Sequence, residues 1–361
     1  MKRLQPIYFL ILAFIPVLMT GCNPKSSEFY TAEDFYKVPK VDVHFHYNTA
    51  DPVWLLFADS LNFRIVSPNV DAGRSIHQQL AIARELKQKY PDNFAFFGTF
   101  GVEHFGAEGF AGQIIARIDS CMEAGATGIK IWKNIGMVLK DSAGNYVMAD
   151  DPAFEPVFKH LENNNIKLMA HLGEPRNCWL PLEEMTLDND RNYFSRHPEY
   201  HMYLHPEAPS YEDQIEVRDN LLLRHPGIDF TGAHLASQEW SVDEVAKSFE
   251  RFPNLLVDFS ARIGHLQYQS LTDPEKVRNF LILYQDRIMY GTDGGVTQNN
   301  TDYAATTENL EKRWLNDWRW LATGEEVIVD NLGGKSVKGI QLPREVIGKI
   351  YAGNAERFFK P

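Results

Sequence analysis

Cysteine is scarce in this chain of 361 residues, which holds three, at positions 22, 121 and 178. That number excludes a protein built on a framework of disulfide bonds. We predict that Cys121 lies in a helix and Cys178 in a loop, so that both are free thiols. Internal repeats and low-complexity tracts are also missing. With 44% hydrophobic and 23% charged residues, the composition is that of an ordinary globular protein.

No cluster of basic residues is present either, and the formal net charge is −12. Proteins that bind nucleic acid gain affinity by releasing counterions from phosphates, whereas an acidic protein repels phosphates. We therefore exclude nucleic acid as a partner and expect a small-molecule substrate. Whether the chain forms a homo-oligomer stays open.

Long apolar runs are limited to residues 7–19, which follow a basic start. A basic start, a short apolar stretch and small residues before a break are typical of a secretory signal. The ending Met-Thr-Gly-Cys22 resembles a bacterial lipobox, which implies that Cys22 is lipidated. We predict a signal peptide over 1–21, a polar tether over 22–39 and a lipoprotein of the cell envelope, on the periplasmic side. An uncleaved anchor helix is the alternative, although the run is short for a membrane span.

From residue 40 onward, short β-rich apolar runs alternate with amphipathic helical stretches. This alternation predicts repeated βα units and a parallel sheet. Eight units predict an α/β fold, a single-domain (β/α)8 TIM barrel over 40–361, with its active site at the carboxyl ends of the strands. The expected strands are 41–46, 63–66, 94–100, 127–132, 166–170, 228–233, 255–259 and 287–290.

Two segments exceed what a barrel needs. Residues 172–210 follow the fifth expected strand and are rich in aromatic residues. Loops of this length are usually functional or disordered, and the aromatic content argues against disorder, so we predict a lid. Residues 325–341 predict a short hairpin with a structural role, inserted before the last helices.

Four histidines and one aspartate stand at the ends of apolar runs. His44 and His46 leave a strand by the same face, because side chains alternate along it, and this spacing suits a transition metal. His171, His234 and Asp293 follow later apolar runs. A lone His-x-His is more often an ordinary partly buried pair, and Asp293 alone could cap a helix. Together at one end of a barrel, the five residues favour a metal site.

This set, in this order, resembles the amidohydrolase superfamily, in its branch of mononuclear-metal hydrolases and decarboxylases. The closing segment 349–359 also looks like the last helix of that branch, and the resemblance covers residues 40–360. It implies a (β/α)8 barrel with one divalent metal ion per chain, with Zn²⁺ the first expectation and Mn²⁺ the second.

The resemblance also implies a role for each of these residues. His44, His46, His171 and Asp293 would bind the metal. Asp293 would in addition carry the proton from the attacking water to the leaving group. His234 would act on the carbonyl or the attacking water, with a metal-ligand role as the alternative.

Lys130 bears on the number of metal ions. Alternation puts Lys130 and Trp132 on one face of the barrel. Family members with two metals carry a carbamylated lysine near this position, and Lys133 is a rival just beyond it. We favour a charged Lys130 that binds a carboxylate or oxygen of the substrate. Further residues that follow strands and could contact substrate are Trp132, Arg262, His104, Glu174 and Glu103.

The leading hypothesis is a metal-dependent hydrolase that cleaves a lactone, ester or amide bond of a small molecule. The alternative enzyme is a non-oxidative decarboxylase, in which Lys130 or Arg262 would grip a carboxylate beside the metal. A different class is a solute-binding lipoprotein, which holds a ligand without reacting it. A set of metal ligands and acid–base groups would serve no purpose in such a protein.

Overall fold

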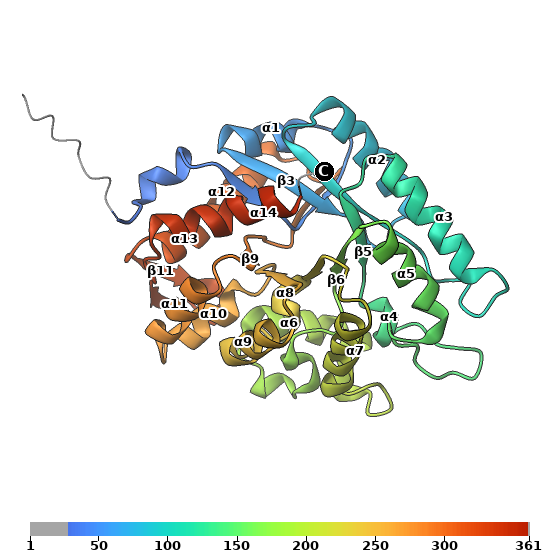
Figure 1. Cartoon of the computed structure of the whole chain (residues 1–361). Coiled ribbons are helices and arrows are strands. Elements are labelled where there is room, and N and C mark those ends of the chain that lie inside the picture. Colours follow the sequence, from blue (N-terminus) through green and yellow to red (C-terminus); the bar gives the residue numbers. More distant parts are fainter. Residues whose placement is uncertain (1–27, 360–361) are drawn as a thin grey trace, which may run out of the picture.

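The computed structural model describes residues 28–359 (Figure 1). The predicted signal peptide, Cys22 and the start of the tether lie outside the described residues. Within the part of the chain that the structure describes, no helix has both the length and the apolarity that crossing a bilayer requires.

Eight parallel strands form one curled sheet in the middle of the molecule (Figure 1). Their order is β1-β3-β4-β5-β6-β7-β8-β9, so strands that follow one another along the chain lie side by side. Seven of the predicted strands are confirmed with small shifts at their ends. The bounds are β1 (Lys40–Asp42), β3 (Phe63–Pro68), β4 (Phe94–Thr99), β5 (Gly128–Ile131), β6 (Lys167–Ala170), β7 (Phe230–Gly232), β8 (Leu255–Asp258) and β9 (Ile288–Met289).

The prediction of one continuous first strand over 41–46 is wrong. The chain bends after β1 and continues as β2 (Phe45–Asn48), which pairs in parallel with β10 (Gly294–Thr297). At the bend, the Val43 N–H donates to the Tyr290 carbonyl at 3.0 Å. The bend occurs because the chain leaves β3 to pair with the segment that follows the last strand. These bonds join the two edges of the sheet, which is consistent with a TIM barrel.

Helices cover the outside of the sheet. In Figure 1, α2, α3 and α5 flank one side of the strands, and α9, α10 and α11 flank the opposite side. The bounds are α1 (Val53–Ser60), α2 (Ile76–Lys89), α3 (Phe110–Glu123), α4 (Asn134–Met137), α5 (Glu155–Asn163), α6 (Asp188–Arg196), α7 (Tyr211–Arg224), α8 (Ala233–Ala236), α9 (Val242–Arg251), α10 (Ile263–Ser270), α11 (Pro274–Leu283), α12 (Tyr303–Ala322), α13 (Arg344–Gly348) and α14 (Asn354–Phe358).

The buried apolar residues form clusters on both faces of the sheet. Leu168 belongs to the large cluster, and its neighbour Met169 belongs to a smaller one, as alternation along a strand requires. The smaller cluster also contains Val66 of β3 and Phe358 of α14. The helix α14 therefore packs against the apolar residues on one face of the sheet. Polar residues gather at the carboxyl ends of the strands.

The segment 172–210 is a packed layer of short helices. Besides α6 it contains η3 (Arg176–Trp179), η4 (Leu182–Glu184), η5 (Pro198–Tyr200) and η6 (Met202–Leu204). Its own small core includes Cys178, Met185 and Phe194. Its role as a lid stays a prediction. Cys121 in α3 and Cys178 in η3 are buried and free, which confirms two separate thiols.

In the segment 325–341, β11 (Glu326–Val329) and β12 (Lys335–Lys338) pair in antiparallel fashion. The hairpin lies against α12, and Val327 and Val337 are buried in the main core. It therefore adds apolar contacts to the outer layer of helices.

Candidate metal centre

Three of the predicted ligands converge where the first and last strands meet. Asp293 Oδ1 lies 3.1 Å from His46 Nε2 and 3.6 Å from His44 Nε2. The ligand atoms of these three residues all lie within 4.8 Å of one another, so they could hold one ion. Imidazole nitrogens with a carboxylate oxygen are a donor set that divalent transition metals accept.

The second ring nitrogen of each of these histidines is already in use. His44 Nδ1 lies 3.1 Å from Asp258 Oδ2, and His46 Nδ1 lies 3.1 Å from the Pro68 carbonyl oxygen. Both oxygens accept hydrogen bonds, so each Nδ1 carries the proton and each Nε2 keeps its lone pair. Histidines that bind metals are usually oriented in this way. The site therefore fits a metal ion in its chemistry as well as in its spacing.

His171 and His234 lie next to this group. Their ring centroids are 4.2 Å apart, and His234 is 4.9 Å from His44. His171 Nε2 is buried without a hydrogen-bond partner in the described residues, which suits a nitrogen that binds an ion. His171 does not belong to the close group of His44, His46 and Asp293, so its role as a ligand stays a prediction.

Asp258, the last residue of β8, is the functional residue that the sequence analysis missed. Besides the contact with His44, its Oδ1 accepts the backbone N–H of His234 at 2.9 Å and that of Ser260 at 3.0 Å. Burial opposes ionisation, but the neighbouring His44 holds the pKa of Asp258 well below its usual range. One carboxylate thus positions two histidines. A signal was available, since Asp258 ends an apolar run just as the histidines do.

His234 begins a strained turn. Residues 234–237 all have φ between 54° and 61°, a left-handed conformation that costs L-residues about 1–2 kcal/mol each. Side chains of Tyr211 and Arg218 donate to two carbonyls of the turn, each at 2.7 Å. His234 Nδ1 donates to the Ser260 carbonyl at 2.7 Å. Strain that is held by so many bonds is a feature of functional sites. His234 is not among the residues that line the adjacent cavity.

A cavity of about 330 Å³ opens beside the histidines, and we refer to it as the metal cavity. Lys130 and Lys133 both line it, but they differ in their contacts. Lys133 forms an ion pair with Glu174 and donates to the Tyr193 hydroxyl at 3.2 Å. Lys130 Nζ is buried and has no hydrogen-bond partner in the described residues, and burial lowers the pKa of Lys130 to about 8. Lys130 is therefore the amine of this cavity that can still donate hydrogen bonds to a ligand.

Glu174 links the segment 172–210 to residues that follow strands of the sheet. Besides its pair with Lys133, its Oε2 lies 3.7 Å from Arg262 Nη2 and 3.5 Å from His171 Nε2. Of the residues predicted to contact substrate, Lys130, Trp132, Glu174 and Arg262 line the metal cavity. His104 and Glu103 are exposed and do not line it.

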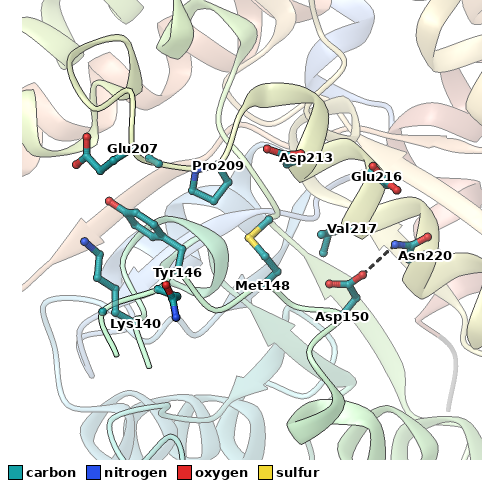
Figure 2. A pocket seen from close by; sticks show the side chains of 13 residues that line it. Lys140, Tyr146, Met148, Asp150, Glu207, Pro209, Asp213, Glu216, Val217 and Asn220 are labelled. Atoms are coloured by element: carbon teal, nitrogen blue, oxygen red, sulfur yellow. Dashed lines mark hydrogen bonds between the residues drawn. The ribbon is translucent and has the colours of Figure 1, made fainter. Parts of the chain in front are cut away.

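A larger cavity of about 700 Å³, here the outer groove, lies between residues 140–150 and the start of α7 (Figure 2). Figure 2 shows Lys140 and Tyr146 on one side of it and Asp213 and Glu216 on the other. None of the residues predicted for the site lines the outer groove.

The family model described as amidohydrolase matches residues 41–360, so the chain belongs to the amidohydrolase family. Members of this superfamily are metal-dependent hydrolases and decarboxylases, and this protein is an enzyme. No curated protein matches the sequence.

Solved structures show the same fold. An amidohydrolase II is 14% identical with a TM-score of 0.51, and the match covers 89% of this chain and 99% of that chain. A 2,6-dihydroxybenzoate decarboxylase bound to 2,6-dihydroxybenzoate is 15% identical with a TM-score of 0.50, and the match covers 90% and 100%. At these identities the likeness concerns the fold alone.

Proposed function

We propose that this enzyme is a hydrolase that cleaves a lactone, ester or amide bond of a small molecule with the help of one divalent metal. The observation that carries the proposal is the geometry of His44 and His46, whose Nε2 atoms face Asp293 while their Nδ1 atoms are engaged. His171, with its unpartnered Nε2, would complete the ligands. A metal held there would supply Lewis-acid chemistry and lower the pKa of a coordinated water.

Asp293 is placed to take up a proton. Its side chain is 32% exposed and lines the metal cavity. Burial alone would raise the pKa of Asp293, but the close contact with His46 and the neighbouring imidazoles hold that pKa well below its usual range. An ionised carboxylate here can accept the proton of the attacking water and pass it to the leaving group.

The charges of the metal cavity favour an anionic group on the substrate. Apart from the histidines, the residues of the lining that carry a charge at neutral pH are Lys130, Lys133, Arg262, Glu174, Asp190 and Asp293. Their charges balance, so a divalent ion leaves the cavity positive. An anionic oxygen of the substrate would restore neutrality, and the free Nζ of Lys130 could donate to it.

The same cations support a second candidate, a non-oxidative decarboxylase. Decarboxylation needs a carboxylate gripped beside the metal, and Lys130 and Arg262 both line the cavity. A screen of lactones, amides and aryl carboxylates with metal-loaded enzyme separates the two candidates. Hydrolysis products would support the hydrolase, and release of CO₂ would contradict it and support the decarboxylase.

We further propose one metal ion per chain, Zn²⁺ first and Mn²⁺ second. Elemental analysis of the wild type and of Lys130→Ala should give about the same content, because Lys130 is assigned to the substrate. A content near two that falls on losing Lys130 would instead indicate a carbamate that bridges two ions.

We also propose that the mature protein is anchored in the cell envelope through a lipid on Cys22. The order of basic, apolar and Thr-Gly-Cys residues at the start of the chain supports this. Expression in a bacterium with labelled lipid should label the wild type but not Cys22→Ser. Equal release of both forms into the soluble fraction would contradict the anchor, since two or more acyl chains bind a membrane firmly.

A further inference from the structure

A second cavity, of about 380 Å³, adjoins the metal cavity. Asn189 and Ala261 line both of them. Gly291 and Thr292, which directly precede Asp293, also line the second cavity. The two cavities therefore share a wall where β8 and β9 end. A group bound in the second cavity would lie next to the metal centre.

Side-chain amides dominate the polar lining of this second cavity, here the amide cavity. Five of them face it, from Asn189, Gln267, Asn309, Asn316 and Asn331. None of the five makes a side-chain hydrogen bond to another described residue. Asn189, Asn309 and Asn331 are exposed and Asn316 is half-buried, so water can bond to these four, whereas Gln267 is only 6% exposed. Buried polar groups normally have partners, because a missing hydrogen bond costs free energy. The nearly buried amide of Gln267, which has no partner among the described residues, therefore points to a ligand.

The α12 wall of the amide cavity is a polar helix face. Residues 309, 312, 313, 316 and 317 recur three and four positions apart, which places them on one side of the helix. The charges along this wall balance. Lys312 lies 3.6 Å from Asp330, which also lines the cavity, and Arg313 is matched by Asp317. The amide cavity thus offers hydrogen bonds without a net charge, in contrast to the metal cavity with a divalent ion bound.

We propose that the amide cavity binds an uncharged group that carries several hydroxyl or amide groups, such as a polyol or a short peptide-like amide. Each amide side chain offers two N–H donors and one carbonyl acceptor, which such a group can satisfy. If the proposed function holds, on which this assignment rests, the amide cavity receives the part of the substrate beyond the bond that is cleaved, while the anionic part lies in the metal cavity.

Ligand-detected NMR with the full-length protein tests this proposal. The neutral probes are methyl glucoside and N-acetylglycinamide, which separate a polyol from an amide ligand, and gluconate is the charged comparison. We expect the wild type to bind at least one neutral probe, and to bind it more tightly than gluconate once the metal has been removed, because the charges of the metal cavity then balance. Asn316→Leu and Gln267→Leu should each weaken that binding by about fivefold for every hydrogen bond lost. The matched control is Gln88→Leu, which removes an exposed amide on α2, outside both cavities, and should bind as the wild type does.

The same binding is expected in protein stripped of metal, which keeps this test separate from catalysis. Neutral probes that bind to an enzyme without hydrolase activity would contradict the proposed function and leave the amide cavity supported. The proposal is overturned if neither neutral probe binds, if gluconate binds as tightly to metal-free protein, or if the leucine variants bind as the wild type does. Circular dichroism checks that each variant folds. If Gln267→Leu does not fold, the binding measured for Asn316→Leu, at a half-buried position, decides the test.

Discussion

The metal cavity and the outer groove differ in what their polar side chains do. In the outer groove, Asp150 accepts hydrogen bonds from Asn220 at 2.9 Å and from Arg224 at 3.0 Å (Figure 2 shows the first). In the metal cavity, Lys130 Nζ and His171 Nε2 are buried without a hydrogen-bond partner in the described residues. Yet the outer groove is the larger, at about 700 Å³ against about 330 Å³. Unused hydrogen-bonding capacity, which costs free energy when buried, therefore marks the candidate site better than volume does.

The largest effect is expected from His171→Ala. If His171 binds the metal, its loss should remove both metal and activity, whereas His234→Asn should keep the metal and lower kcat. Elemental analysis and turnover on the same preparations measure both. A metal-free His234→Asn beside a loaded His171→Ala would show that the two histidines have exchanged roles.

Asp293→Asn should lower kcat by about 10²–10⁴-fold, the usual contribution of a proton-transferring group. Much of the metal should remain, because asparagine keeps one ligand oxygen. Asparagine also tolerates the left-handed backbone of this position, where φ is 58°. Metal content and kcat are measured together, and a variant of near wild-type kcat would rule out Asp293 as the proton carrier.

Asp258→Asn tests whether a residue that is not itself a metal ligand increases the affinity of the site for metal. The variant loses the charge that accepts the His44 Nδ1–H. Metal affinity should fall by roughly 10–100-fold, as is typical when such a supporting carboxylate is changed. Competition with a chelator gives the affinity, and circular dichroism gives the fold. An unchanged affinity would reduce Asp258 to a structural role.

Asp317→Asn probes the amide cavity through stability. Burial raises the pKa of Asp317 from its ordinary value of 3.8 to about 6, and the Tyr290 hydroxyl donates to it at 2.8 Å. Between those pH values the folded state binds more protons than the unfolded state, so rising pH lowers the stability of the wild type. The variant keeps an acceptor for Tyr290 without the charge. Its melting temperature should therefore exceed that of the wild type above about pH 6 and approach it below about pH 4. A difference that does not vary with pH would contradict this.

The smallest effect is expected from Glu216→Gln in the outer groove. Glu216 is exposed and has no ion pair among the described residues. Both kcat/KM and stability should change little, by no more than about twofold for activity, as for most surface substitutions. A large loss of kcat/KM would show that the outer groove takes part in function and would contradict the conclusion that the metal cavity alone is the candidate site.

The sequence by itself determined the order of the strands and the placement of the histidines at strand ends. Apolar runs with period-two alternation are local signals, and parallel strands bring their carboxyl ends to one edge. It also separated Lys130 and Trp132 from their neighbours Ile129 and Ile131, which the structure places in the core on the other face. These features depend only on near neighbours in the chain.

Only the tertiary structure decided the features that depend on long-range contacts. The bend before His44 exists because Val43 bonds to Tyr290 at the far edge of the sheet. Asp258 positions His44 across 214 residues of chain. Lys130 rather than Lys133 is free because Glu174, in a distant segment, pairs with Lys133. The amide cavity likewise forms where five separate segments meet, and no local pattern of apolar and polar residues encodes such a meeting.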